Sequence, residues 1–141
     1  MTHRDADKTT GKPIRLFHGT ADDWVRIGPC RDYVERLKHA GAEARLTEYR
    51  GAFHAYDVSY FHAYDVSYFK ELMRLPDAQT ARNCTMVEGD DGVVLNAGTG
   101  QPFTLDDPCV ERGVFVAYDA AAHQATVRAV KEFLLAAFKL E

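Results

Sequence analysis

The sequence has few side chains that act as nucleophiles, and none of them lies in a nucleophile-elbow motif. The candidates are Ser59, Ser67, Cys30, Cys84 and Cys109. A nucleophile elbow places glycine two residues before and two residues after the nucleophile, because the turn is sharp and strained. Cys30 comes nearest to this pattern, with Gly28 two residues before it but Asp32 two residues after it. The sequence therefore contains no elbow of the G-x-S-x-G type.

Other missing features exclude further classes of protein. With 17 Lys and Arg against 21 Asp and Glu, the net charge is −4, and no basic surface for nucleic acid is expected. No apolar run is long enough to span a membrane, and the amino terminus has no apolar signal segment, so we expect a cytoplasmic protein without a membrane partner. No Cys-x-x-Cys spacing indicates zinc, and no metal or other cofactor is expected.

The length and composition favour one small domain. The chain has 141 residues, of which 46% are hydrophobic, which is enough for a core of its own. Residues 1–12 are polar and are expected to form a solvated lead-in.

An acid and a histidine each follow a strand-like run. The apolar run 14–17 precedes Asp22, and the alternating run 44–49 precedes His54. Between them, residues 28–41 have helical spacing, with proline near the start and glycine at the end. A strand–helix–strand unit of this length implies parallel strands whose carboxyl ends share one edge. The two side chains are therefore expected to meet there, as a carboxylate and a histidine do in a hydrolase triad.

Several motifs together resemble the carboxyl-terminal half of the dienelactone hydrolase family of α/β-hydrolases. They are His-Gly-x-x-Asp-x-x-Val at 18–25, Gly-Pro-Cys-Arg at 28–31, Leu-Thr-Glu-Tyr at 46–49, Gly-Ala-Phe-His at 51–54 and Ala-Tyr-Asp-Ala at 117–120. The resemblance covers nearly the whole chain and about half of the family's domain. It implies a carboxylic-ester or lactone hydrolase with a partial α/β-hydrolase fold. In such an enzyme a cysteine or serine attacks the carbonyl, the histidine shuttles the proton, and the acid orients the histidine.

On the matching positions, Asp22 is the acid and His54 the histidine. Asp23 is an alternative acid, although it is expected to cap the turn instead. Trp24 is expected to pack beside the site, and His18 to be a structural residue at a strand end.

The family order is nucleophile, acid, histidine, and only 21 residues precede Asp22. We therefore expect a partial domain that hydrolyses a small ester or lactone only when the missing half completes it. The alternative is a non-catalytic homologue that self-associates or completes a split partner. The open edge of the first strand favours this alternative, since such an edge pairs readily with another chain.

Residues 53–68 contain an exact tandem duplication that departs from the family. Residues 53–60 read FHAYDVSY, and residues 61–68 repeat this without change. His54 keeps the family's spacing from the preceding strand, so it is preferred to His62 as the triad histidine. An alternative hypothesis is that, if the segment is helical, the duplicated histidines and carboxylates share a face and bind a divalent metal. These residues are His54, Asp57, His62 and Asp65.

Residues 84–109 are expected to form a hairpin-bearing insertion outside the main sheet. Two strand-like runs, 84–88 and 93–95, flank the turn signal Asp91-Gly92. Cys84 and Cys109 lie at the ends of the insertion, where they either form a disulfide or remain free thiols.

A long helix is expected to end the chain. Asp119 is its expected cap, and apolar residues at helical spacing predict a stripe that packs on the sheet. The stripe consists of Val127, Val130, Leu134 and Phe138.

Overall fold

The computed structural model describes residues 9–58 and 71–140 and shows a mixed α/β fold. Within these residues it contains two α-helices and three small two-stranded sheets. The elements are β1 (Ile14–Gly19), α1 (Gly28–His39), β2 (Ala44–Tyr49), β3 (Met73–Thr80), β4 (Met86–Glu88), the 3₁₀ turn η2 (Asp90–Gly92), β5 (Val94–Asn96), β6 (Glu111–Val116) and α2 (Ala120–Phe138).

The first three elements form the predicted strand–helix–strand unit. β1 and β2 are parallel, and their register runs from Ile14 opposite Ala44 to Gly19 opposite Tyr49. Proline lies in the first turn of α1, where its missing N–H costs no hydrogen bond. Gly41 follows the helix with a φ of +84°, a left-handed conformation that glycine adopts without strain. The prediction of parallel strands joined by a crossover helix is confirmed.

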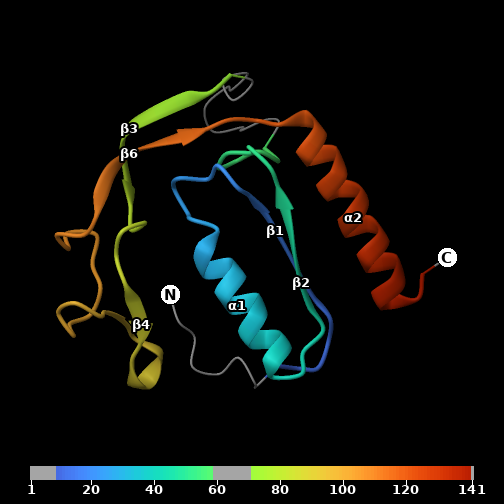
Figure 1. Cartoon of the computed structure of the whole chain (residues 1–141), viewed down its shortest axis with the longest axis horizontal. Helices are drawn as coiled ribbons and strands as arrows, with labels where there is room; N and C mark the ends of the chain where they lie inside the picture. Colours follow the sequence, from blue (N-terminus) through green and yellow to red (C-terminus); the bar gives the residue numbers. More distant parts are fainter. Residues whose placement is uncertain (1–8, 59–70, 141) are drawn as a thin grey trace.

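The two helices lie on opposite faces of this parallel pair (Figure 1). Val34 and Leu37 of α1 pack with Ala44 and with Leu16 on one face. Side chains alternate along a strand, so Arg15 points to the other face. There its guanidinium lies 5.1 Å from the ring centroid of Phe133 in α2. The parallel pair is therefore the middle layer of three.

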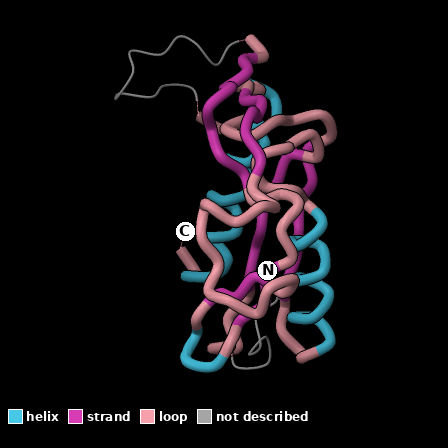
Figure 2. Tube along the Cα trace, turned by 90° about the vertical axis from the view of Figure 1, so that its left-hand side faces the viewer, coloured by secondary structure: helices cyan, strands magenta, loops and turns pink. Residues whose placement is uncertain are grey.

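An antiparallel pair, β3 and β6, was not predicted from the sequence. The two strands pair from Met73 opposite Val116 to Thr80 opposite Glu111, with a register shift between Leu75 and Gln79. Pro76 lies in this shift, where the regular ladder of backbone hydrogen bonds is already interrupted and its missing N–H costs no bond. Figures 1 and 2 show the pair extending beyond the β1–β2 layer.

The end of β6 joins the antiparallel pair to the segment that contains His54. Val116 forms a parallel bridge with His54, and the N–H of Ala117 donates to the His54 carbonyl at 3.2 Å. The chain then enters α2 directly. This join brings β3 and β6 close to the predicted site.

Residues 84–109 contain the predicted hairpin. β4 and β5 pair antiparallel around η2, and their sheet is separate from the other two. A disulfide joins Cys84 to Cys109, while Cys30 is a free, half-buried thiol in α1. Of the two alternatives for the terminal cysteines of the insertion, the structure shows the bridge.

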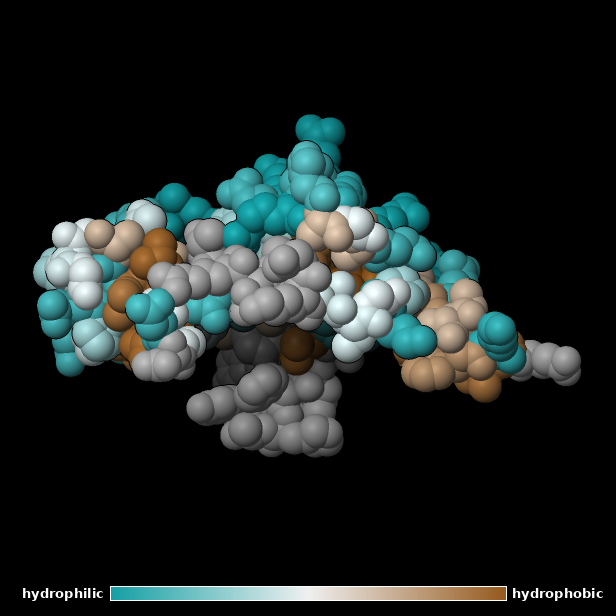
Figure 3. All heavy atoms as spheres, turned by 90° about the horizontal axis from the view of Figure 1, so that it is seen from below, coloured by the Kyte–Doolittle hydropathy of each residue, from teal (hydrophilic) through white to brown (hydrophobic). Residues whose placement is uncertain are grey.

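The final helix has the predicted cap but not the predicted packing. The carboxylate of Asp119 accepts hydrogen bonds from the backbone N–H groups of Ala121 and Ala122, both at 3.0 Å. Of the expected core stripe, Val130 is half-buried, whereas Val127 is 54% exposed, Leu134 41% and Phe138 68%. In Figure 3, apolar surface gathers at the end of the molecule where α2 ends. The core prediction is wrong for these three exposed side chains, because the two-stranded sheet β1–β2 is too narrow to cover this side of the helix.

Candidate active site

The loop after β1 and the loop after β2 approach each other closely. The backbone N–H of Ala21 donates to the carbonyl of Ala52 at 3.0 Å, and that of Thr20 to the carbonyl of Tyr49 at 2.9 Å. Gly19 permits this approach, since a Cβ there would lie only 2.2 Å from the Ala52 oxygen. Glycine at the end of β1 therefore allows the two strand ends to present their side chains side by side.

Asp22 and His54 meet at this edge. One carboxylate oxygen of Asp22, Oδ2, lies 3.0 Å from Nδ1 of His54. The other, Oδ1, accepts the backbone N–H groups of Trp24 at 3.0 Å and Val25 at 2.8 Å. The turn thus fixes one oxygen and leaves the other to orient the imidazole.

Asp22 is held in its ionised form. Burial alone would raise the pKa of Asp22, but the hydrogen bonds from His54 and from the Val25 N–H outweigh it. Together with the charges of His54 and His18, they hold the pKa below the ordinary value of 3.8. An ionised carboxylate only accepts hydrogen bonds, so Nδ1 of His54 carries the proton. This leaves Nε2 of the neutral ring as the nitrogen that can act as a base.

The lowered pKa predicts an acid-sensitive contribution to folding. Because the pKa of Asp22 is lower in the folded state than in the unfolded state, its stabilisation is present above pH 3.8. It is lost as the pH falls through the folded pKa, since the unfolded state then binds more protons. We expect the free energy of unfolding to fall less steeply below pH 4 in Asp22→Asn than in the unsubstituted protein. Urea unfolding between pH 3 and pH 7, followed by the fluorescence of the single tryptophan, measures this.

Asp32→Asn is the matched control for the pH series, because it removes an exposed carboxylate from α1. Its unfolding curve should keep the pH dependence of the unsubstituted protein. Parallel curves for the unsubstituted protein and Asp22→Asn below pH 4 would contradict the prediction.

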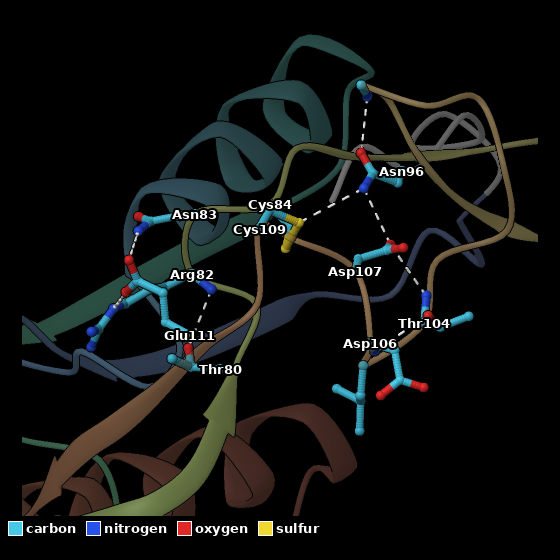
Figure 4. Close-up of a disulfide and its surroundings, with 12 residues drawn as sticks. Thr80, Arg82, Asn83, Cys84, Asn96, Thr104, Asp106, Asp107, Cys109 and Glu111 are labelled. Atoms are coloured by element: carbon cyan, nitrogen blue, oxygen red, sulfur yellow. Dashed lines mark hydrogen bonds and ion pairs between the residues drawn. A yellow bond between two sulfur atoms is a disulfide. The ribbon is translucent and has the colours of Figure 1, made fainter.

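The neighbouring carboxylate, Asp23, has a structural position. Its Oδ1 accepts the backbone N–H of Phe115 in β6 at 2.9 Å, and its Oδ2 pairs with Arg82 at 3.1 Å. Arg82 also donates to Glu111 at 2.8 Å (Figure 4). Asp23 therefore anchors the loop to β6 and to Arg82, which follows β3. The turn amides that it was expected to cap are bound by Asp22 instead.

Trp24 packs beside the pair, as predicted. Its ring centroid lies 4.8 Å from that of His54, and its indole N–H donates to the carbonyl of Gln79 at 2.9 Å. The hydroxyl of Thr80 donates to the Trp24 carbonyl at 2.7 Å. The end of β3 thus holds the loop that contains Asp22. Sequence reasoning missed Gln79, Thr80 and Arg82 because nothing in their local pattern indicates contact with a loop more than 50 residues earlier.

His18 lies at the strand end, next to the acid. Its Nδ1 donates to the carbonyl of Gly19 at 2.8 Å, and its Nε2 lies 4.0 Å from Oδ2 of Asp22. This second distance is too long for a hydrogen bond. His54 is therefore the histidine that the carboxylate orients.

A cleft of about 1260 Å³ opens beside the Asp22–His54 pair. Both residues line it, together with Trp24 and with side chains from β3 and α2. Cys30 is not among the residues that line the cleft. Burial and the charge of Asp22 raise the pKa of the Cys30 thiol, which keeps it protonated and a poor nucleophile.

The duplication is only partly within the described residues. Residues 55–57 form a turn after His54, so the helix that would place His54 and Asp57 on one face is not present there. His62, Asp65 and the two serines lie outside the described residues. In the part of the chain that the structure describes, no group of three or more His, Cys, Asp or Glu side chains is arranged to hold a metal.

The sequence matches no known family model and no curated protein, and the structure matches no solved structure. Within residues 9–58 and 71–140, neither helix is long and apolar enough to cross a membrane.

Proposed function

We propose that the chain is part of a carboxylic-ester or lactone hydrolase of the dienelactone hydrolase type. In this proposal the described elements are the carboxyl-terminal part of an α/β-hydrolase domain. Asp22 is the acid and His54 the general base, while the nucleophile comes from outside this sequence. The motif resemblance and the parallel β1–α1–β2 unit support the fold assignment.

The hydrogen bond between Asp22 and His54 is the observation on which this proposal rests. A triad acid holds the imidazole in one tautomer and stabilises the charged ring that forms when the nucleophile loses its proton. The 3.0 Å contact and the lowered pKa of Asp22 support the assignment of both roles to Asp22, and the cleft lies beside the pair. Nε2 of His54 would accept the proton of the nucleophile and return it to the leaving alcohol.

The proposal is tested by adding a protein segment that carries the nucleophile. The amino-terminal half of a dienelactone hydrolase is fused upstream of residues 1–141 or expressed with them, and hydrolysis of 4-nitrophenyl acetate is measured. We expect turnover from the assembled protein and none above background from this chain alone. Robust turnover by the chain alone would contradict the proposal.

A second measurement needs no assembly partner. In the neutral form of the His54 ring, ¹⁵N NMR of the chain alone should place the proton on Nδ1, and Asp22→Asn should shift the ring towards a mixture of tautomers. An unchanged tautomer in Asp22→Asn would show that the carboxylate does not orient the ring. That result would also contradict the proposed function.

The exposed surface of α2 favours a second candidate function, a non-catalytic chain that self-associates. Among the described residues β1 pairs only with β2, so one of its edges is open. Leu134 and Phe138 add apolar side chains that are 41% and 68% exposed. An open edge and a nearby apolar helix face are both features of an association surface.

Self-association gives a direct prediction. We expect sedimentation velocity to detect a dimer, and Leu134→Glu with Phe138→Glu to raise its Kd by at least about tenfold. Each of these side chains contributes about 1.5–3 kcal/mol when it is fully buried. Ala121→Glu with Ala136→Glu is the control, because it adds the same charge to exposed α2 positions outside the stripe. A protein that stays monomeric at high micromolar concentration would rule this function out.

A further inference from the structure

We propose that the cleft beside Asp22 and His54 accepts an ester or lactone whose acyl part is apolar and uncharged, and discriminates against an acyl part that bears a carboxylate. This inference rests on the proposed function and narrows its substrate class. It depends on which side chains line the cleft and on where the nearby cations lie.

The walls of the cleft are largely apolar. β3 contributes Met73 and Leu75, and β6 and α2 contribute Val116 and Val130. Side chains alternate along a strand, so Arg74 lies on the opposite face of β3 from its two neighbours. Its guanidinium lies against Gly113, where an added Cβ would be 2.5 Å from Nη2. The strand therefore presents apolar side chains to the cleft and turns its cation away.

Apart from the imidazoles of His18 and His54, the side chains of the cleft wall that carry charge near neutral pH are carboxylates. Asp57 and Asp77 line it in addition to Asp22, and no Lys or Arg is among the described lining residues. Two arginines beside the wall have partners of their own: Arg112 donates to the backbone carbonyl of Asp77 at 2.8 Å, and Arg82 pairs with Asp23 and with Glu111.

An anionic ligand would consequently lose its hydration without gaining an ion pair with Lys or Arg. A buried carboxylate needs a charged or hydrogen-bonding partner, and without one its transfer from water is strongly unfavourable. The exposed carboxylates of Asp57 and Asp77 also repel an anionic ligand. An uncharged apolar chain faces neither cost and gains contact with Met73, Leu75 and Val130.

Two probes with the same carbon skeleton test the inference on the chain itself. They are 4-phenylbutanamide, which is uncharged, and 4-phenylbutanoate, which is anionic at pH 7.5. Binding is measured by calorimetry and by the fluorescence of Trp24, which lines the cleft and is the single tryptophan. We expect the amide to bind at least about tenfold more tightly than the carboxylate. Equal affinity, tighter binding of the carboxylate, or no saturable binding of the amide would overturn the inference.

Charge variants show whether the cleft itself discriminates. Asp57→Asn with Asp77→Asn should tighten binding of the carboxylate by about two- to fivefold, since exposed charge pairs have small effects, and should change binding of the amide by a smaller factor. Asp32→Asn removes a carboxylate from α1, outside the cleft, and should change neither affinity. A gain with Asp32→Asn equal to that of the double variant would assign the effect to net charge and overturn the inference.

These binding measurements do not depend on turnover. If the amide is preferred but the assembled protein does not hydrolyse esters, the proposed function fails and the inference about the cleft survives. If hydrolysis occurs but the carboxylate binds equally well, the inference alone fails.

Discussion

Replacing Cys84 and Cys109 by serine is expected to lower the free energy of unfolding by about 3.5 kcal/mol. The bridge joins residues 25 positions apart, and the chain-entropy model gives a contribution of this size for a loop of that length. Few other contacts hold the insertion. Neither cluster of buried apolar side chains in the described chain contains a residue of 84–109, and β4 and β5 have three residues each.

A buried polar group adds to this dependence. Asn96 is 7% exposed, and its amide donates to Asp107 at 3.2 Å and to the sulfur of Cys109 at 3.7 Å (Figure 4). Its side-chain oxygen accepts the N–H of Gly98 at 2.9 Å. When the bridge is removed, these hydrogen bonds must hold the loop against a larger gain of chain entropy in the unfolded state.

Urea unfolding of the air-oxidised protein, compared with the double serine variant and with the reduced protein, measures the effect. Cys30→Ser is the control, since it removes a sulfur and keeps the bridge; its change should be much smaller. Peptide mapping without reductant should recover Cys84 linked to Cys109. A bridge to Cys30, or equal stability with and without reductant, would contradict the prediction.

The strand–helix–strand unit and the Asp22–His54 contact could be predicted because their signals are local. Apolar runs, a proline near the start of α1 and a glycine after its end define the elements, and parallel pairing then brings both strand ends to one edge. The hairpin turn and the Asp119 cap are also local, since each depends on residues within a few positions of the element.

The antiparallel β3–β6 pair could not be predicted because its signal is not local. β3 contains Pro76 and several polar residues, and it is held by pairing with residues about 30 to 40 positions later. The packing of α2 was predicted wrongly for a related reason. A helical stripe shows that one face is apolar, but only the width of the neighbouring sheet decides whether that face is covered.

The distinction between Asp22 and Asp23 leads to the prediction with the largest expected effect. In the assembled hydrolase, Asp22→Asn should lower kcat by up to about 10⁴-fold, because an amide no longer holds His54 in the tautomer that a base requires. Asp23→Asn changes the adjacent residue in the same way. Its oxygen can still accept the Phe115 N–H, and only the pairing with Arg82 is lost. Asp23→Asn should therefore weaken folding while leaving kcat nearly unchanged.

The same assay distinguishes the roles of His54 and His62, the two histidines of the duplication. The bond to Asp22 belongs to His54, whose position is fixed by the bridge to Val116 and by the loop that follows β2. His54→Ala should therefore abolish turnover, and His62→Ala should preserve it. Activity lost only with His62→Ala would move the triad histidine to the second copy. Activity lost with Asp23→Asn but kept with Asp22→Asn would show that the 3.0 Å contact is not the catalytic one. Circular dichroism of each variant separates loss of catalysis from loss of fold.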